Sequence, residues 1–378
     1  MMLHMPTGSG KTRTAMSVIC QLLNQTEPGL VVWLAHSEEL CEQAVEEFER
    51  VWAARGIRPV EVQRWWGPHS LKLPVIKDGL IVAGLAKAYA AARTSLAEIG
   101  SLAGRVNLVV MDEAHQAIAP TYKLILDVLT ESGTPTPLLG LTATPGRSWN
   151  DVDEDERLAE FFNRAKVSLE VEGYDNPVRF LIDEGYLAET QFVQLDYTAG
   201  SELSLEELQE LRDSLDIPQS IIESLAADEQ RNLLILNQAE LMCRRHNRII
   251  VFAATKDHAV VLATVLRARG YWSYAVTGET PTNDRARIIE TYRTASDEPR
   301  LIVNYGVLTT GFDAPQTSAA VIARPTKSLV LFSQMVGRAT RGEKAGGNRA
   351  AEVATVVDTR LPGFCNMNQA FRNWEDVW

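Results

Sequence analysis

Residues 5–12 of this chain read MPTGSGKT, between a short apolar start and a helix-like stretch, Arg13–Leu23. Glycines at positions 8 and 10 allow the tight turn in which successive backbone amides point at phosphate oxygens. A lysine that follows can reach the β and γ phosphates, and the next hydroxyl can bind Mg²⁺. The general pattern G-x-x-x-x-G-K-[ST] has Gly where this chain has Met5. The stretch predicts a phosphate site, with these candidate residues: Pro6, Thr7, Gly8, Ser9, Gly10, Lys11 and Thr12.

A second motif, which is acidic, lies about a hundred residues further on. Residues 108–111 read LVVM, typical of a buried strand, and residues 112–115 read DEAH. An aspartate at the carboxyl end of a strand can hold Mg²⁺ through water, which gives Asp112 and Thr12 as metal candidates. Glu113 is then placed to orient or deprotonate the water that attacks a γ phosphate. Alone, this tetrapeptide would equally fit the acidic start of a helix, but together with residues 5–12 it predicts nucleotide hydrolysis.

Short apolar runs alternate with amphipathic stretches along most of the chain. This pattern predicts βαβ units with parallel sheets covered on both faces. A clear helix, Lys256–Arg269, follows one of the later strands, and Asn176–Leu187 predicts a short helix with Pro177 in its first turn. The expected strands are Leu30–Ala35, Leu80–Gly84, Leu108–Met111, Leu138–Leu141, Gln191–Asp196, Arg248–Ala253, Ser273–Val276, Leu301–Val303 and Ala319–Ile322.

The chain has 378 residues, which is enough for about two domains. We place their boundary near residue 188, so that the domains span residues 1–188 and 189–378. The net charge of −12 is uneven: it is −1 over residues 1–150, −17 over residues 151–230 and +6 over residues 231–378. The acidic segment 151–230, expected to be mainly helical, spans the junction. The whole-chain charge therefore does not exclude a phosphate-binding face elsewhere.

Cysteine and hydropathy patterns bear on the compartment. Four cysteines lie far apart without a C-x-x-C pair, which excludes a zinc ribbon or a disulfide scaffold and fits a reducing cytoplasm. No run approaches the ~18 consecutive apolar residues of a membrane span. We therefore predict a cytoplasmic protein with no membrane partner.

The motifs, taken in order, resemble those of superfamily 2 helicases and translocases, with the closest similarity to the XPB-like and restriction-translocase group. MPTGSGKT and VVMDEAHQ resemble motifs I and II, and WLAHSEEL (Trp33–Leu40) is similar to motif Ia. LTATP (Leu141–Pro145) resembles motif III, and Arg248–Ala254 resembles motif IV. VNYGVLTTGFD (Val303–Asp313) is similar to motif V, and QMVGRATR (Gln334–Arg341) matches motif VI. The resemblance spans nearly the whole chain.

This resemblance implies two RecA-like α/β domains that hydrolyse ATP in the cleft between them. It implies that Arg341 and Arg338 contact the γ phosphate with Gln334 beside them, and that Asp313 joins the nucleotide site. Arginines three residues apart would share one face of a helix, and guanidinium groups suit phosphate oxygens. Without the resemblance, basic residues on a solvated helix would be the favoured interpretation.

Coupling and nucleic-acid residues also come from the resemblance. It implies that His115, Thr142 and Thr144 couple the nucleotide site to the nucleic-acid track, although LTATP alone could be an ordinary loop. Candidate contacts to nucleic-acid phosphates are Ser37, Thr277 and Thr309. For each of them, an ordinary hydroxyl that caps a helix or lies in a loop is the alternative interpretation. Trp65–Trp66 could stack bases, but adjacent residues rarely share one face, so packing is favoured.

We therefore predict an ATP-dependent, Mg²⁺-requiring helicase or translocase, with DNA favoured over RNA because LTATP and TTGFD resemble the DNA-acting branches. The alternatives are a duplex-DNA translocase that does not unwind, an RNA helicase, and a nucleotide-gated binding subunit whose protein partner docks on residues 151–230. Related enzymes carry an adenine-recognising glutamine motif upstream of motif I, whereas only four residues precede Met5 here. We expect either that this sequence starts inside a longer protein, or that the protein works without that motif.

Overall fold

The structure is a computed structural model that describes residues 1–6, 8–71, 75–131, 135–143, 152–198, 204–214, 216–308, 314–359 and 361. The described residues form two compact units. Unit 1 holds those up to 143 and from 152 to 170, and unit 2 holds those from 171 onward. This division precedes helix α7, whereas the domain boundary predicted near residue 188 follows it. The two divisions therefore differ over residues 171–188.

Unit 1 is a seven-stranded sheet in the order β3-β4-β2-β5-β6-β1-β7, and every strand pairing in it is parallel. Its strands are β1 Met2–His4, β2 Leu30–Ala35, β3 Val62–Trp65, β4 Gly79–Gly84, β5 Leu108–Asp112, β6 Leu138–Thr142 and β7 Lys166–Ser168. Its helices are α1 Lys11–Gln25, α2 Glu38–Arg55, α3 Leu85–Thr94, α4 Leu96–Ala103, the 3₁₀ turn η2 Ala114–Gln116, α5 Pro120–Glu131 and α6 Val152–Phe161.

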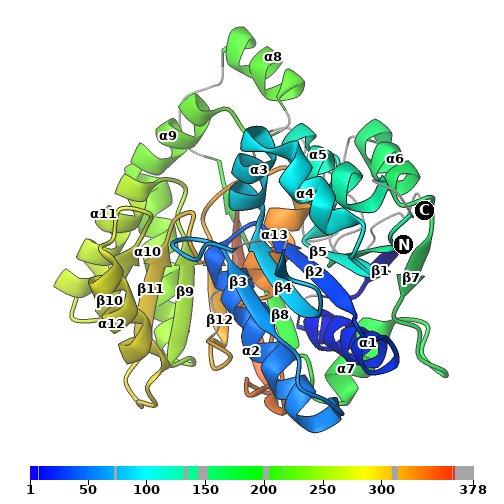
Figure 1. Cartoon of the computed structure of the whole chain (residues 1–378). Coiled ribbons are helices and arrows are strands. Elements are labelled where there is room, and N and C mark those ends of the chain that lie inside the picture. The colour runs from blue at the N-terminus through cyan, green and yellow to red at the C-terminus, as the bar shows by residue number, and fades with distance from the viewer. Residues whose placement is uncertain are drawn as a thin grey trace. The chain divides into compact units, whose positions relative to one another are not determined.

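Helices cover both faces of this sheet, so the residues of its inner strands β2 and β4 are apolar throughout instead of alternating. Val31 and Trp33 of β2 pack in the cluster that holds α1 and α2. Val32 and Leu34 pack on the other face with α3, α4 and α5. Figure 1 shows α1 and α2 on one side of β2 and β4, with α3, α4 and α5 on the other. The buried runs that predicted these strands are therefore explained by two-sided cover.

Unit 2 is a six-stranded sheet in the order β10-β11-β9-β12-β13-β8, again with only parallel pairings. Its strands are β8 Glu189–Tyr197, β9 Arg248–Phe252, β10 Trp272–Val276, β11 Arg300–Asn304, β12 Ala319–Ile322 and β13 Ala350–Asp358. Its helices are α7 Pro177–Asp183, α8 Leu205–Asp213, α9 Gln219–Ala227, α10 Glu229–Cys243, α11 Lys256–Ala268, α12 Thr282–Arg293, α13 Leu329–Val336 and the 3₁₀ turn η3 Glu343–Ala345.

The prediction of two α/β halves with mainly parallel sheets is confirmed. The acidic segment 151–230 supplies helices, as expected, and also the sheet strands β7 and β8. Helices α9 and α10 follow each other directly, because Asp228 ends α9 and caps α10 by accepting a hydrogen bond from the Arg231 amide at 3.0 Å. In the described part of the chain, no helix combines the length and apolar character needed to cross a bilayer.

Candidate functional site

The parallel order of the unit 1 sheet gathers the predicted nucleotide residues at one edge. In such a sheet the carboxyl ends of all strands meet at the same edge. Residues 5–12 follow β1, the DEAH stretch begins at the end of β5, and Thr142 ends β6, which pairs with both. The Met5 amide donates to the Thr142 carbonyl at 3.2 Å. Stretches more than a hundred residues apart in sequence therefore lie on three adjacent strands.

The turn after β1 has the backbone that its glycines predict. Gly8 and Gly10 have φ values of 81° and 94°, a region that disfavours side chains. Nothing lies within 4 Å of a methyl group placed on Gly10, so glycine is required there for its conformation and not for lack of space. Gly10 is also the N-cap of the 15-residue helix α1. The amides of the first turn of α1 therefore point toward the turn, an arrangement suited to phosphate.

Lys11, the first residue of α1, is held at this turn by backbone oxygens. Its Nζ donates to the carbonyls of Met5 at 3.1 Å and Pro6 at 3.4 Å. The Ser9 hydroxyl donates to the Pro6 carbonyl at 2.6 Å. These hydrogen bonds join the two ends of the turn through the Lys11 ammonium group. Thr12 is half-buried one residue further along α1, and Thr7 lies outside the described residues.

Asp112 is a buried carboxylate at the tip of β5. It is 8% exposed, and its Oδ1 accepts a hydrogen bond from the Glu113 amide at 3.0 Å. Burial, and then the neighbouring Glu113 charge, raises the pKa of Asp112 to about 7, while Lys11 acts in the opposite direction. A cation at this carboxylate would offset both unfavourable effects.

Magnesium fits this donor set. Mg²⁺ in phosphate-transfer sites takes one or two protein ligands and completes its shell with water and substrate phosphates. Asp112 and the Thr12 hydroxyl supply such oxygen ligands. Among the described residues, no group of three or more His, Cys, Asp or Glu side chains forms an all-protein metal site.

Glu113 occupies an unusual backbone conformation. It has φ 52° and ψ 52°, in the left-handed region, and it starts the 3₁₀ turn η2. Its Oε2 lies 3.4 Å from Nδ1 of His115, which is 5% exposed. The pair links the predicted water-activating group to a predicted coupling residue. Thr142 is fully buried at the end of β6, and Thr144 lies outside the described residues.

Sequence reasoning did not single out His36, which belongs to the same edge. It directly follows β2, the neighbour of β5. Burial lowers the pKa of His36, against the opposing charges of Glu113 and Glu39. Its Nδ1 is buried without a hydrogen-bond partner among the described residues. The available signal was its place after a strand, but strand order cannot be obtained from sequence alone.

Unit 2 holds the motif VI residues at the end of α13. Gln334 lies in the last turn of this helix, which ends at Val336 with Gly337 as its C-cap. The expectation that Arg338 and Arg341 share one helical face is therefore wrong, because both follow the helix end. Arg341 instead forms an antiparallel bridge with Leu187. Asp313 of motif V lies outside the described residues.

The candidate nucleic-acid contacts have local roles where they are described. The Ser37 hydroxyl caps α2 by accepting from the Leu40 amide at 3.3 Å. The Thr277 side chain is 6% exposed and accepts from the Glu279 amide at 3.3 Å. Thr309 lies outside the described residues. Trp65 and Trp66 are both buried, in the clusters on opposite faces of the sheet, which confirms packing as their role.

Two family models match the chain at these two units. Residues 1–147 match the family described as type III restriction enzyme, res subunit. Residues 231–343 match the helicase conserved C-terminal domain. Together the models cover more than half of the chain and include its motifs I, II and VI. The chain belongs to the superfamily 2 helicases and translocases.

Other members of this superfamily are similar over much of the chain. IRC3 of Saccharomyces cerevisiae, named as an ATP-dependent helicase, is 26% identical over 246 residues, which are 62% of this chain and 32% of IRC3. The helicase MrfA bound to DNA has a TM-score of 0.64 at 15% identity and covers 98% of this chain and 45% of MrfA. S. cerevisiae Dbp5 bound to RNA and ADP BeF3 also has a TM-score of 0.64, at 18% identity, over 99% of this chain and 84% of Dbp5. These structures show that the superfamily fold is shared.

The chain spans about a third of the length of IRC3 and about half of MrfA. The matched region is therefore one part of each of these two proteins. Because the DNA-bound and RNA-bound structures are equally similar in fold, their likeness does not select a nucleic acid for this superfamily 2 chain.

Proposed function

We propose that this chain is an ATP-driven motor that moves along nucleic acid. The observation that carries the proposal is the sheet edge in unit 1. The glycine turn with Lys11 follows β1 there, Asp112 and Glu113 lie at the end of β5, and only β6 lies between these two strands. On ATP binding, Lys11 exchanges its bonds to the Met5 and Pro6 carbonyls for the β and γ phosphate oxygens. The first-turn amides of α1 bind the remaining phosphate charge.

Hydrolysis then depends on Glu113. Its carboxylate orients and deprotonates the attacking water, and its position is fixed by the η2 turn and by His115. Asp112 and Thr12 would hold Mg²⁺, which would neutralise charge on the phosphates. Arg338 and Arg341 are the proposed contacts for the γ phosphate, with Gln334 beside them, and an arginine in this role contributes roughly 10³–10⁵ in rate. Asp313 would join this site from motif V.

DNA is the proposed track. The match of residues 1–147 to a restriction-enzyme family and the sequence motifs LTATP and TTGFD support DNA over RNA. Ser37, Thr277 and Thr309 remain candidate phosphate contacts, and His115, Thr142 and Thr144 remain candidate coupling residues. The acidic segment 151–230 is the proposed docking segment for a protein partner, and the cytoplasm remains a proposal from the cysteine pattern. Whether the motor separates strands can be tested by comparing strand displacement with triplex displacement.

The site is tested by two substitutions with a matched control. Lys11→Ala should abolish productive ATP binding. Glu113→Gln should keep ATP binding and lower turnover by about 10²–10⁴-fold, because it removes only the general base. Glu46→Gln, an exposed carboxylate on α2, should turn over ATP like the unmodified chain. Steady-state hydrolysis by Glu113→Gln at the rate of the unmodified chain would refute the assigned mechanism.

A further inference from the structure

Arg341 lies beyond the end of α13, so another element must hold it in place. Backbone hydrogen bonds join its segment to residues 185–188. The Ala188 amide donates to the Thr340 carbonyl, the Gly342 amide to the Tyr186 carbonyl and the Lys344 amide to the Gly185 carbonyl, each at 2.9 Å. With the bridge between Leu187 and Arg341, these bonds flank the arginine on both sides. We call residues 185–188 and 340–344 the corner clasp.

The clasp is set by the way α7 ends. The Gly185 amide donates to the Ile182 carbonyl at 2.9 Å and the Tyr186 amide to the Leu181 carbonyl at 2.8 Å, a Schellman motif. Gly185 has φ 74°, the left-handed conformation that this motif requires. The turn directs the chain from α7 into β8 and presents residues 185–188 to the motif VI segment. The path of residues 185–188 therefore sets the place of the Arg341 backbone.

Gly342 is the closest contact within the clasp. A methyl group there would lie 2.6 Å from the Gly185 carbonyl carbon and 2.7 Å from that of Tyr186. Both are backbone atoms, so a side chain at position 342 requires the two segments to separate. The half-exposed side chain of Lys344 adds to the clasp: its Nζ pairs with Glu184 at 2.7 Å and lies 5.1 Å from the centre of the Tyr186 ring.

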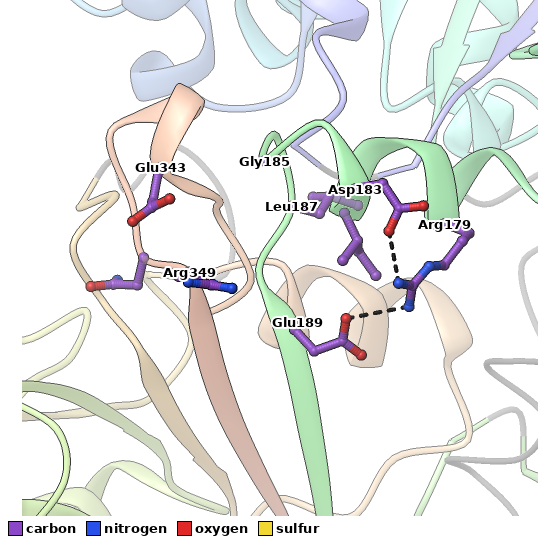
Figure 2. A pocket seen from close by; sticks show the side chains of 9 residues that line it. Arg179, Asp183, Gly185, Leu187, Glu189, Glu343 and Arg349 are labelled. Atoms are coloured by element: carbon purple, nitrogen blue, oxygen red, sulfur yellow. Dashed lines mark hydrogen bonds and ion pairs between the residues drawn. The ribbon is translucent and has the colours of Figure 1, made fainter.

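A hollow of about 480 Å³ lies beside the clasp, between α7 and the segment that leads into β13. Figure 2 shows Arg179 turned toward Asp183 and Glu189 on one side, with Glu343 and Arg349 across from them. Arg179 pairs with Asp183 at 2.7 Å and with Glu189 at 3.4 Å. Because this side of the clasp is open, the clasp depends on its backbone hydrogen bonds and not on close packing there.

We propose that the α7–β8 corner, Gly185–Ala188, is the positioning element for Arg341, with Gly342 as the contact that allows the two segments to meet. This rests on the proposed function, because Arg341 is taken to act on the γ phosphate. The corner acts through Arg341, because its hydrogen bonds fix the position of the backbone on both sides of the arginine. A displacement of about 1 Å at a catalytic group can cost about 10²-fold in rate.

The test is Gly342→Ala, measured as kcat and KM for ATP hydrolysis beside Gly100→Ala. Gly342→Ala should lower kcat by about 10²-fold while KM changes little, because the phosphates bind at the unit 1 turn. Gly100→Ala adds the same methyl group in open space on α4 and should leave both constants near those of the unmodified chain. Combining Gly342→Ala with Arg341→Ala should lower kcat no further than Arg341→Ala alone, since both changes act through one group.

Two results would overturn the proposal. One is a folded Gly342→Ala protein with unchanged kcat, and the other is an additive loss in the double variant. If Gly342→Ala does not fold, Gly185→Ala and Gly185→Asn decide: alanine strains the left-handed turn, whereas asparagine tolerates it, so only alanine should lower kcat. Equal kcat for these two variants would also refute the positioning role. The proposed function fails separately, if the unmodified chain turns over ATP no faster than Lys11→Ala.

Discussion

Residues with constrained backbones mark the candidate site in unit 1. Glu113 has a positive φ, as do only two other non-glycine residues in the described part of the chain, Asn163 and Arg164. Such a conformation costs about 1–3 kcal/mol and persists where the surroundings determine it. Here the next residue, Ala114, is fully buried against β6. The packing beneath Glu113 therefore helps to fix the carboxylate that the proposed hydrolysis uses.

Gly140 is the residue that makes this packing possible. A methyl group on it would lie 2.7 Å from Cβ of Ala114 and 2.6 Å from the ring of Phe162. Gly140→Ala should therefore cost about 1–3 kcal/mol of unfolding free energy, as overpacked cores do. It should also lower ATP turnover, because Ala114 adjoins Glu113.

Urea unfolding and ATPase rates measure both effects. Gly100→Ala, on α4, where the added methyl group meets open space, is the control and should be neutral or slightly stabilising. Unchanged stability in Gly140→Ala would show that this contact does not constrain the turn.

At the scale of elements, a buried ion pair ties three parts of unit 2 together. Arg231 of α10 is fully buried, and its Nε lies 3.0 Å from Oδ1 of Asp358 at the end of β13. Its Nη2 also donates to the Ala323 carbonyl after β12 at 2.7 Å. Removing one partner of such a pair leaves a buried charge without compensation.

Asp358→Asn should therefore destabilise the protein by about 3–5 kcal/mol, measured by urea unfolding. Combining it with Arg231→Met should recover much of that loss, because the uncompensated charge is then gone. A loss in the double variant equal to the sum of the single losses would contradict this explanation. Asp284→Asn, in an exposed pair with Arg287 on α12, is the control and should cost less than about 1 kcal/mol.

Elements with uniform apolar runs could be predicted from sequence, and those decided by tertiary contacts could not. The strands at 30–35 and 319–322 have the predicted bounds, because both are buried on two faces. Strand β13 was not predicted: Glu352 interrupts its apolar run and is compensated by Arg245 and His246, which are over a hundred residues away. The end of α13 ahead of Arg338 was also missed, because the bridge to Leu187 is a long-range contact.

The same limit holds for the candidate site. The turn at residues 5–12 and the DEAH stretch were found because local spacing encodes their chemistry. The proximity of His36 to Glu113 depends on β2 lying beside β5, and the clasp on Arg341 depends on how α7 ends. Neither can be obtained from the spacing of residues along the chain.

At the scale of the whole molecule, the net charge is distributed unevenly along the sequence. Residues 151–230 carry −17 and residues 231–378 carry +6. A protein that binds nucleic-acid phosphates through basic groups releases counterions, so its affinity falls as salt rises. The half-saturating DNA concentration for ATPase stimulation should therefore rise by about tenfold or more between about 50 and 200 mM salt. Unstimulated turnover at the same salt concentrations is the control, and a half-saturating concentration independent of salt would exclude a phosphate-based grip.

If nucleic acid drives ATP hydrolysis at the unit 1 edge, as we propose, the chain is an ATPase that needs its track. The most direct test is steady-state ATP turnover by the chain alone and with duplex DNA, single-stranded DNA or RNA, with Lys11→Ala as the blank. We expect turnover well above the blank, stimulated more by DNA than by RNA. Turnover equal to that of Lys11→Ala with every nucleic acid would show that the chain is not such a motor.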